Sequence, residues 1–253
     1  MHRADRSVLH LPGPGGPARV PVVAVPGLGL SVEVPARALR HLRDVVGSTV
    51  LALPGYGVPP GRGPALDPPA LDPPALATRL LERLDGLAVG RAVLLGHSAS
   101  CQIVVEAARQ EPARVAAAVL VGPTTDPRAA GWPTLAARWV RTAAWERPGQ
   151  IPLLVRSYGR TGLAAMARAM DAARRHRLDA AVADLTCPVL VVRGRHDRIA
   201  PADWVAALAR RAPDGRAATL PVGAHMVPIT HPAALAAAVS AFAAGVGPPA
   251  PPP

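Results

Sequence analysis

LLGHSASC, residues 94–101, is the stretch that decides the fold class. An apolar run reaches Gly96, a single serine stands at position 98 among small residues, and a helical pattern follows. This pattern is typical of a strand that turns sharply into a helix and holds its serine at the edge of a sheet. A serine that only caps the helix is the alternative interpretation of Ser98.

The bulk composition indicates one globular α/β domain rather than a nucleic-acid-binding or membrane protein. Half of the 253 residues are hydrophobic, 3% are aromatic, and the formal charge of +11 is carried entirely by arginine. No expected helix combines a continuous arginine stripe with aromatic residues, so nucleic acid is not an expected partner. No apolar run reaches the roughly 18 residues of a membrane span. The N-terminus lacks a signal-peptide pattern, so we expect a cytoplasmic protein.

Strand and helix patterns alternate along most of the chain. Strands are expected at 7–11, 20–25, 49–57, 92–96, 115–122, 187–194 and 216–222, and helices at 35–46, 75–87, 98–110, 201–212 and 232–244. This alternation predicts an α/β fold whose mostly parallel sheet carries helices on both faces.

The alternation stops between residues 127 and 184, which contain three of the four tryptophans. Helical patterns cover about 133–147 and 161–183 of this segment. We therefore predict a core domain from 1–126 and 185–245, with a helical cap of 127–184 over the carboxyl ends of the strands, where such sheets bind ligands. The Pro-rich tail, 246–253, is expected to be disordered.

A serine hydroxyl needs a base to act as a nucleophile. His225 lies in a loop after the last expected strand and is the preferred candidate. His231 reads as the opening of the last helix and ranks second. His97 adjoins Ser98, but adjacent side chains diverge at such a turn, so it is not the expected base.

The base in turn needs a carboxylate that fixes its tautomer and stabilises the imidazolium. Asp197 follows the strand expected at 187–194, and Asp126, after the preceding strand, is its competitor. With Asp197 the chain order is Ser, Asp, His, which is the order of enzymes with a nucleophile elbow. The two cysteines, Cys101 and Cys187, suggest neither a disulfide framework nor a zinc site, and no metal or cofactor is expected.

Taken in order, these segments resemble the α/β-hydrolase-fold serine hydrolases, esterase- or lipase-like with a helical cap, over roughly residues 20–244. The matching segments are VPGLGLS (25–31), LPGYG (53–57), GHSAS (96–100), and RGRHDRIAP (193–201) with GAHMVPITHP (223–232). The resemblance implies a mostly parallel sheet with helices on both faces and a small cap inserted after the sixth strand.

The resemblance also implies the catalytic roles. Ser98 would be the nucleophile, His225 the base and Asp197 the acid of a triad. The backbone amides of Leu28 and Ala99 would form the oxyanion hole.

Two positions depart from the family pattern. The oxyanion loop begins Pro26-Gly27 instead of His-Gly, and Ser100 stands where the elbow has its last glycine. The oxyanion donor is a backbone amide, and serine is small, so neither departure forbids hydrolysis. Ser rather than Asp at position 98 argues against the dehalogenase and epoxide-hydrolase branches.

The expected reaction is hydrolysis of a carboxylic ester or lactone through an acyl-enzyme, with a small apolar ester-like substrate. Gly27, His97, Trp132 and Trp139 are the expected substrate-binding residues, although the tryptophans could instead attach the cap to the core. A thioesterase acting on carrier-bound acyl groups and a ligand-binding protein without turnover are the alternatives. A lyase or perhydrolase with the same triad also fits the sequence.

Charge in the expected cap is unevenly distributed. Between residues 128 and 177, ten arginines face only Glu146 and Asp171, a balance of +8. This balance suggests an acidic carrier protein as a second partner, and a solvated arginine surface is the simpler interpretation.

Overall fold

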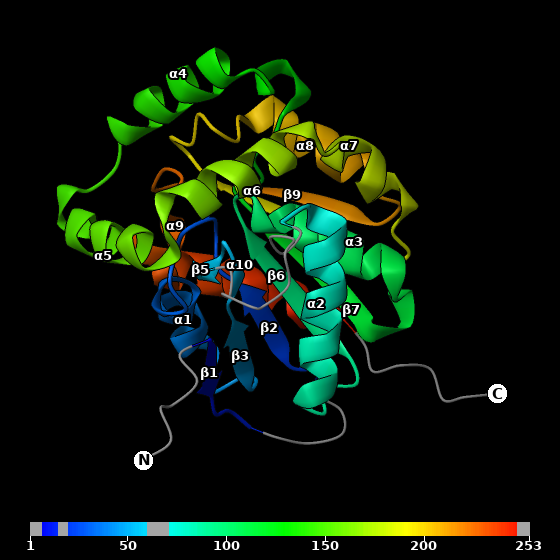
Figure 1. Ribbon diagram of the computed structural model, residues 1–253. Helices are drawn as coiled ribbons and strands as arrows, with labels where there is room; N and C mark the ends of the chain where they lie inside the picture. The colour runs from blue at the N-terminus through cyan, green and yellow to red at the C-terminus, as the bar shows by residue number, and fades with distance from the viewer. Residues whose placement is uncertain (1–6, 15–19, 60–70, 247–253) are drawn as a thin grey trace, which may run out of the picture.

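The computed structural model describes residues 7–14, 20–59 and 71–246 (Figure 1). Its main sheet has seven strands in the order β1-β3-β2-β6-β7-β8-β9, all parallel except β1, which pairs antiparallel with β3. The strands are β1 (Val8–Leu11), β2 (Val22–Val25), β3 (Ser48–Leu51), β6 (Ala92–His97), β7 (Val115–Val121), β8 (Val189–Gly194) and β9 (Gly215–Leu220). The predicted α/β class with a mostly parallel sheet is confirmed.

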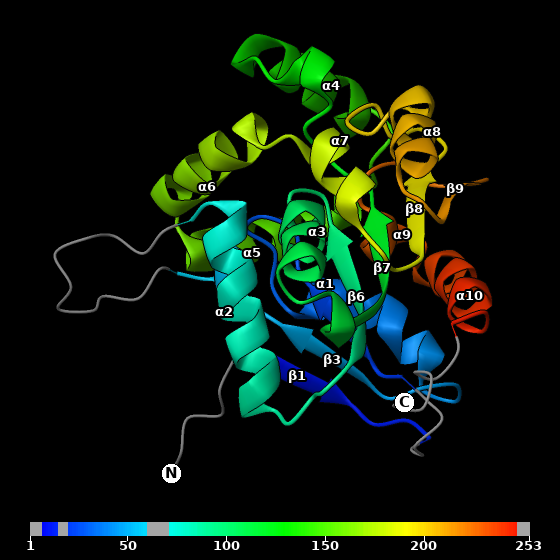
Figure 2. The same ribbon diagram turned by 90° about the vertical axis from the view of Figure 1, so that its right-hand side faces the viewer.

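Helices cover both faces of the sheet, which explains why its central strands are apolar throughout. β2, β6 and β7 are buried at every residue, so no polar-apolar alternation marks them in the sequence. One core cluster packs α2 (Pro73–Gly86), α3 (Ser100–Gln110) and α8 (Ala202–Arg211) against the sheet. The other packs α1 (Glu33–Leu39), η1 (Arg40–Leu42) and α10 (Pro232–Ala243) against the opposite face (Figure 2).

Residues between β7 and β8 fold as helices that lie above the carboxyl ends of the strands (Figures 1 and 2). They form η3 (Pro127–Ala129), α4 (Trp132–Ala143), η4 (Pro148–Gln150), α5 (Ile151–Thr161), α6 (Leu163–Arg175), α7 (Leu178–Ala181) and η5 (Val182–Asp184). β7 is the fifth strand of the main sheet in chain order. β4 and β5 form a separate pair, so the segment follows the fifth described strand of the main sheet, where a sixth strand was expected.

Two local differences from the sequence prediction come from proline and glycine. α5 lies mostly outside the helical stretches expected at 133–147 and 161–183, because Pro148, Pro152 and Gly159 argue against a helix there. Pro152 lies in the first turn of α5, where a helix needs no amide from it. The strand expected at 49–57 breaks after β3 into the short pair β4 (Leu53–Pro54) and β5 (Gly57–Val58), joined through Gly55 at φ 81°.

Three further observations concern features singled out in the sequence. Cys101 and Cys187 are both buried and unpaired, and burial raises the pKa of the Cys187 thiol to about 11. In the described ranges, no helix combines the length and the apolar character that crossing a membrane would require. The tail expected to be disordered lies, from residue 247 onward, outside the described residues.

Candidate active site

Ser98 lies at the junction of β6 and α3, in a backbone conformation that residues other than glycine rarely adopt. Its φ is 61°, and its amide donates to the Val121 carbonyl at 2.8 Å. A Cβ on Gly96 would lie 2.7 Å from Cys101 N and Ser100 O, so only glycine fits two residues before the serine. Strained left-handed residues of this kind cluster at functional sites. The turn therefore has the geometry expected of a nucleophile elbow.

Ser98, His225 and Asp197 form one hydrogen-bonded chain. His225 Nε2 lies 2.9 Å from Ser98 Oγ, and His225 Nδ1 lies 2.9 Å from Asp197 Oδ2. Asp197 has no exposed surface, and its other oxygen accepts from the amides of Ile199 at 2.9 Å and Ala200 at 3.0 Å. The aspartate is thus fixed by two amides while it orients the imidazole, which is the arrangement that general-base activation of a serine requires.

The two expected oxyanion donors follow neighbouring parallel strands, Leu28 in the loop after β2 and Ala99 just after β6. Leu30 N donates to Gly27 O at 2.9 Å, and Gly29 has a φ of 73°, as the third residue of a tight turn often does. Ala99 is the first residue before α3. Within the described part of the chain, the Leu28 and Ala99 amides donate to no other protein group. Both amides are therefore free to bind an anionic oxygen.

A cavity of about 250 Å³ lies between the segment 127–184 and the loop of His225. Its lining is mainly apolar: Trp139, Ala143, Pro148, Ile151, Leu154, Tyr158, Ile199 and Met226, with Thr142, Glu146, Arg147, Gln150 and His225. The Trp139 and His225 ring centroids are 5.8 Å apart. Trp132 is not in this lining; it is 46% exposed, and the Arg174 guanidinium lies 5.2 Å from its ring.

Comparison with known sequences now decides the family. Residues 22–238, most of the chain, match the profile of the Alpha/beta hydrolase family. The chain belongs to the alpha/beta hydrolase family. Members of this family are generally hydrolytic enzymes. No curated protein matches the sequence.

Solved alpha/beta hydrolase structures resemble this one over nearly their whole length. A hydrolase from Oleispira antarctica gives a TM-score of 0.80 at 15% identity, covering 95% of each chain. The enol-lactonase from Burkholderia xenovorans LB400 gives 0.70 at 19% identity, covering 93% of this chain and 95% of that one. A thermophilic esterase from Thermogutta terrifontis gives 0.70 at 21%, covering 94% and 93%. At these identities the likeness establishes the shared fold alone.

The electrostatics of this hydrolase site favour an ionised Asp197. Burial by itself would raise the pKa of Asp197, but the charge and hydrogen bond of His225, the Ala200 amide and Arg193 lower it below its usual value. Burial would likewise lower the pKa of His225, but the charge and hydrogen bond of Asp197, with a contribution from Glu146, raise it above 6.5. The carboxylate therefore stabilises the protonated imidazole that a proton transfer from Ser98 would produce.

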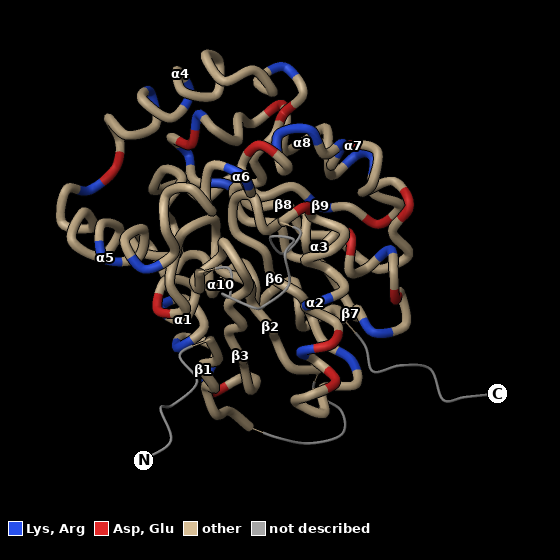
Figure 3. Tube along the Cα trace, in the orientation of Figure 1, with Lys and Arg blue, Asp and Glu red and all other residues tan. Residues whose placement is uncertain are grey.

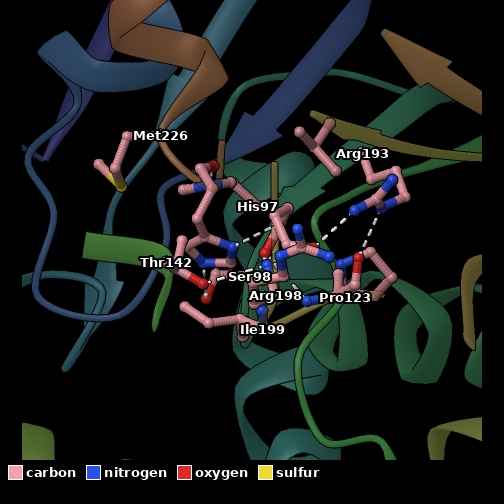
Figure 4. Close-up of polar contacts among 12 residues, drawn as sticks. His97, Ser98, Pro123, Thr142, Arg193, Arg198, Ile199 and Met226 are labelled. Carbon is pink, nitrogen blue, oxygen red and sulfur yellow. Dashed lines mark hydrogen bonds and ion pairs between the residues drawn. The ribbon is translucent and has the colours of Figure 1, made fainter. Parts of the chain in front are cut away.

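Arg193 fastens the loop that carries Asp197. It is 5% exposed, and its guanidinium donates to the carbonyls of Ala200 at 2.7 Å, Asp197 at 2.6 Å and Arg195 at 3.2 Å (Figure 4). The sequence offered no signal for this role, because a lone arginine at a strand end resembles the many surface arginines of this chain.

The two competing residues from the sequence analysis lie elsewhere in the hydrolase. Asp126 forms ion pairs with Arg128 at 2.7 Å and Arg138 at 2.8 Å and caps η3, with no bond to His225. His231 directly precedes α10, and its ring lies 3.0 Å from Thr230 Oγ1. The structure brings Asp197 and His225 to Ser98, and it brings neither competitor there.

His97 is fully buried next to His225. Its Nε2 donates to the His225 carbonyl at 3.0 Å, which leaves Nδ1 unprotonated and facing Gly27, where a Cβ would lie 2.8 Å away (Figure 4). Burial, followed by the neighbouring His225, lowers the pKa of His97 to about 3, so the ring stays neutral at working pH. His97 and Gly27 thus support the His225 loop in this structure, and neither lines the cavity.

Two residues that sequence reasoning missed connect α4 and its following turn to the triad loops. Thr142 Oγ1 accepts from Arg198 N at 3.1 Å, next to Asp197 (Figure 4). Glu146 Oε1 accepts from Met226 N at 2.8 Å, next to His225, and its Oε2 accepts from Gln150 at 3.0 Å. These contacts join residues that are far apart in the sequence, so no local pattern predicts them.

Ser100, the departure from the glycine pattern, is fully buried and hydrogen-bonded. Its hydroxyl accepts from His97 N at 2.8 Å and lies 2.9 Å from the Val25 and His97 carbonyls, to which it can donate. The serine therefore ties the elbow to β2, the strand before the Leu28 turn.

We expect Ser100→Ala to lower the free energy of unfolding by about 1–3 kcal/mol, because it leaves buried backbone groups without their partner. Urea denaturation followed by circular dichroism measures the change. Thr134→Ala, on the exposed surface of α4, serves as the control with no expected loss. An unfolding free energy equal to that of the control would show that the Ser100 hydroxyl contributes nothing to the elbow.

Proposed function

We propose that this protein is a serine hydrolase that cleaves a carboxylic ester or lactone through an acyl-enzyme. The observation that carries the proposal is the hydrogen-bonded chain from Ser98 through His225 to Asp197. A serine, a base in contact with it and a buried carboxylate behind the base are the three parts that acyl transfer needs.

In the proposed mechanism Ser98 Oγ attacks the carbonyl carbon while His225 Nε2 takes the hydroxyl proton. Asp197 stabilises the imidazolium, and the Leu28 and Ala99 amides bind the tetrahedral oxyanion. His225 then protonates the leaving oxygen as the carbon-oxygen bond breaks. Water, activated by the same histidine, attacks the acyl-enzyme and releases the acid and free Ser98.

The cavity supports a small or medium apolar substrate. Its volume of about 250 Å³ lies near the lower end of ligand cavities. Trp139 and the aliphatic side chains Ile151 and Leu154 would contact the apolar part of such a substrate. We propose that residues 127–184 act as a cap that supplies most of this wall, on a core of 1–126 and 185–245.

The pH dependence of kcat/KM gives one test of the base. Only neutral His225 can accept the Ser98 proton, and its pKa is raised, so activity should fall on the acid side with a midpoint above 6.5. Glu146→Gln removes one negative charge that raises this pKa, so the midpoint should move to lower pH. Glu111→Gln, at the exposed end of α3, should leave the midpoint unchanged. An acid limb centred below 6.5 in the wild type would contradict this assignment of the base.

A fluorophosphonate probe tests the proposal directly. Intact-protein mass should show one adduct on the wild type and none on Ser98→Ala. Absence of an adduct on folded wild type would overturn the proposal and favour a ligand-binding protein. Wild type that reacts with the probe and, before labelling, turns over acyl-thioesters but not esters or lactones would instead favour a thioesterase acting on carrier-bound acyl groups.

A further inference from the structure

α4 turns an apolar surface away from the protein. Its exposed side chains include Pro133, Ala136, Ala137 and Val140, which share one face of the helix at three- and four-residue spacing. Val140 is 73% exposed. The buried residues of this helix, Leu135 and Thr142, lie on the opposite side. An exposed helix usually shows the reverse arrangement, with polar residues outside.

α5 repeats this arrangement beside the cavity. Ile151 is 55% exposed and Val155, one turn later, is 65% exposed. The buried residues of the helix are Ser157 and Thr161, both polar. Leu153, Leu154 and Tyr158 are partly buried against the protein, so α5 has apolar side chains both toward the protein and in solvent. We call the exposed side chains of Pro133, Ala136, Ala137, Trp139, Val140, Ile151 and Val155 the cap face.

The cap face continues into the candidate active site. Trp139 and Ile151 both line the cavity, yet they remain 38% and 55% exposed. Val140 follows Trp139 in the chain, and Val155 lies one turn beyond Ile151. Each helix thus has an exposed valine close in the chain to an apolar residue that lines the cavity beside His225.

Positive charge borders this apolar surface. Arg141 and Arg147 are exposed, and in the described ranges no carboxylate forms an ion pair with either of them. Arg147 lines the cavity together with Trp139 and Ile151. Figure 3 shows basic positions on α4 and α5. Glu146 is the only acidic residue between 132 and 161, and its carboxylate is bound to the Met226 amide. The five arginines of residues 132–161 outnumber this single carboxylate, so the stretch carries net positive charge.

We propose that the cap face docks on a lipid surface that contains anionic lipids. Apolar side chains including tryptophan, flanked by arginines, are the composition of helices that lie in a membrane interface. Arginine side chains can lay their carbon stems along the apolar surface while the guanidinium groups reach lipid phosphates.

Charge argues for this occupant over a second copy of the chain. Two cap faces brought together would oppose the same arginines, whereas an anionic lipid surface neutralises them. A purely acidic protein surface would match the arginines but would leave Val140, Val155 and the other aliphatic groups facing polar side chains.

The test measures binding to vesicles, with Ser98→Ala used beside the wild type so that lipid turnover plays no part. Vesicles of phosphatidylcholine alone are compared with vesicles that also contain phosphatidylglycerol, at low and high salt. Trp132, Trp139 and Trp145 report contact through a blue shift of fluorescence, while Trp204 in the core is 4% exposed and stays constant. Flotation gives the bound fraction.

We expect binding to the phosphatidylglycerol vesicles that weakens with salt. The double variant Val140→Asp, Val155→Asp should bind at least about tenfold more weakly, since neither valine lines the cavity but both lie on the cap face. Val45→Asp makes the same substitution at a 40% exposed valine outside the cap face. This control variant should bind as the wild type does.

Three results would overturn the proposal. The first is that the wild type binds neither kind of vesicle, and the second is that the double variant binds as tightly as the wild type. The third is that light scattering without lipid reveals a dimer that the double variant dissociates, which would assign the cap face to a second copy. All three readouts are independent of esterase activity, so failure of the proposed function would leave this test intact.

Discussion

Ser98→Ala is expected to lower kcat by about 10⁴- to 10⁶-fold, because a triad that loses its nucleophile loses the covalent route entirely. The protein should remain folded, since the change removes one oxygen whose only bond in the described structure is to His225 Nε2. Steady-state kinetics on a small aryl ester measures the loss, and far-UV circular dichroism checks the fold.

Ser98→Gly separates catalysis from backbone strain at the same position. Glycine adopts the φ of 61° without steric cost, so this variant should be as inactive as Ser98→Ala but more stable than it by about 1 kcal/mol. Near wild-type rates in either variant would remove Ser98 from the mechanism.

Asp197→Asn should lower kcat by about 10⁴-fold, since an amide in this place holds the imidazole in the wrong tautomer. His225 Nδ1 must donate to residue 197 for Nε2 to accept the Ser98 proton. The asparagine nitrogen can itself donate to Nδ1, and the proton then moves to Nε2. The oxygen that becomes a nitrogen, Oδ2, lies 2.9 Å from His225 Nδ1, so the effect should appear in kcat with little change in KM.

Asp126→Asn is the matched control for this prediction. Asp126 is as deeply buried as Asp197, but its partners are Arg128 and Arg138 rather than a histidine. We expect this variant to lower the melting temperature while kcat stays within a few-fold of the wild type. A larger catalytic loss in Asp126→Asn than in Asp197→Asn would move the acid to the end of β7.

The sheet could be predicted because local patterns encode it. Buried parallel strands such as β6 and β7 are continuous apolar runs, and the elbow has a local steric requirement at Gly96. The loops of Asp197 and His225 follow neighbouring parallel strands, β8 and β9, whose carboxyl ends meet at one edge. Loop positions after expected strands, together with the chain order Ser, Asp, His, therefore predicted which side chains would lie close together.

The segment above the sheet could not be predicted to the same degree. The first turn of helix α5 tolerates Pro152, so composition concealed the helix. Trp132 and Trp139 look equivalent in the sequence, yet only Trp139 lines the cavity. The bonds of Thr142 and Glu146 to the triad loops depend on how α4 packs, which no spacing in the chain specifies.

The chain has no lysine, so every basic side chain around the cap face is a guanidinium. Guanidinium groups stay protonated far above pH 10, whereas ammonium groups begin to lose their charge there. Raising the pH through the range in which His225 becomes neutral therefore leaves the field of this surface constant. Acid titration of activity and the ionic attraction of the surface can thus be varied independently, the first with buffer and the second with salt.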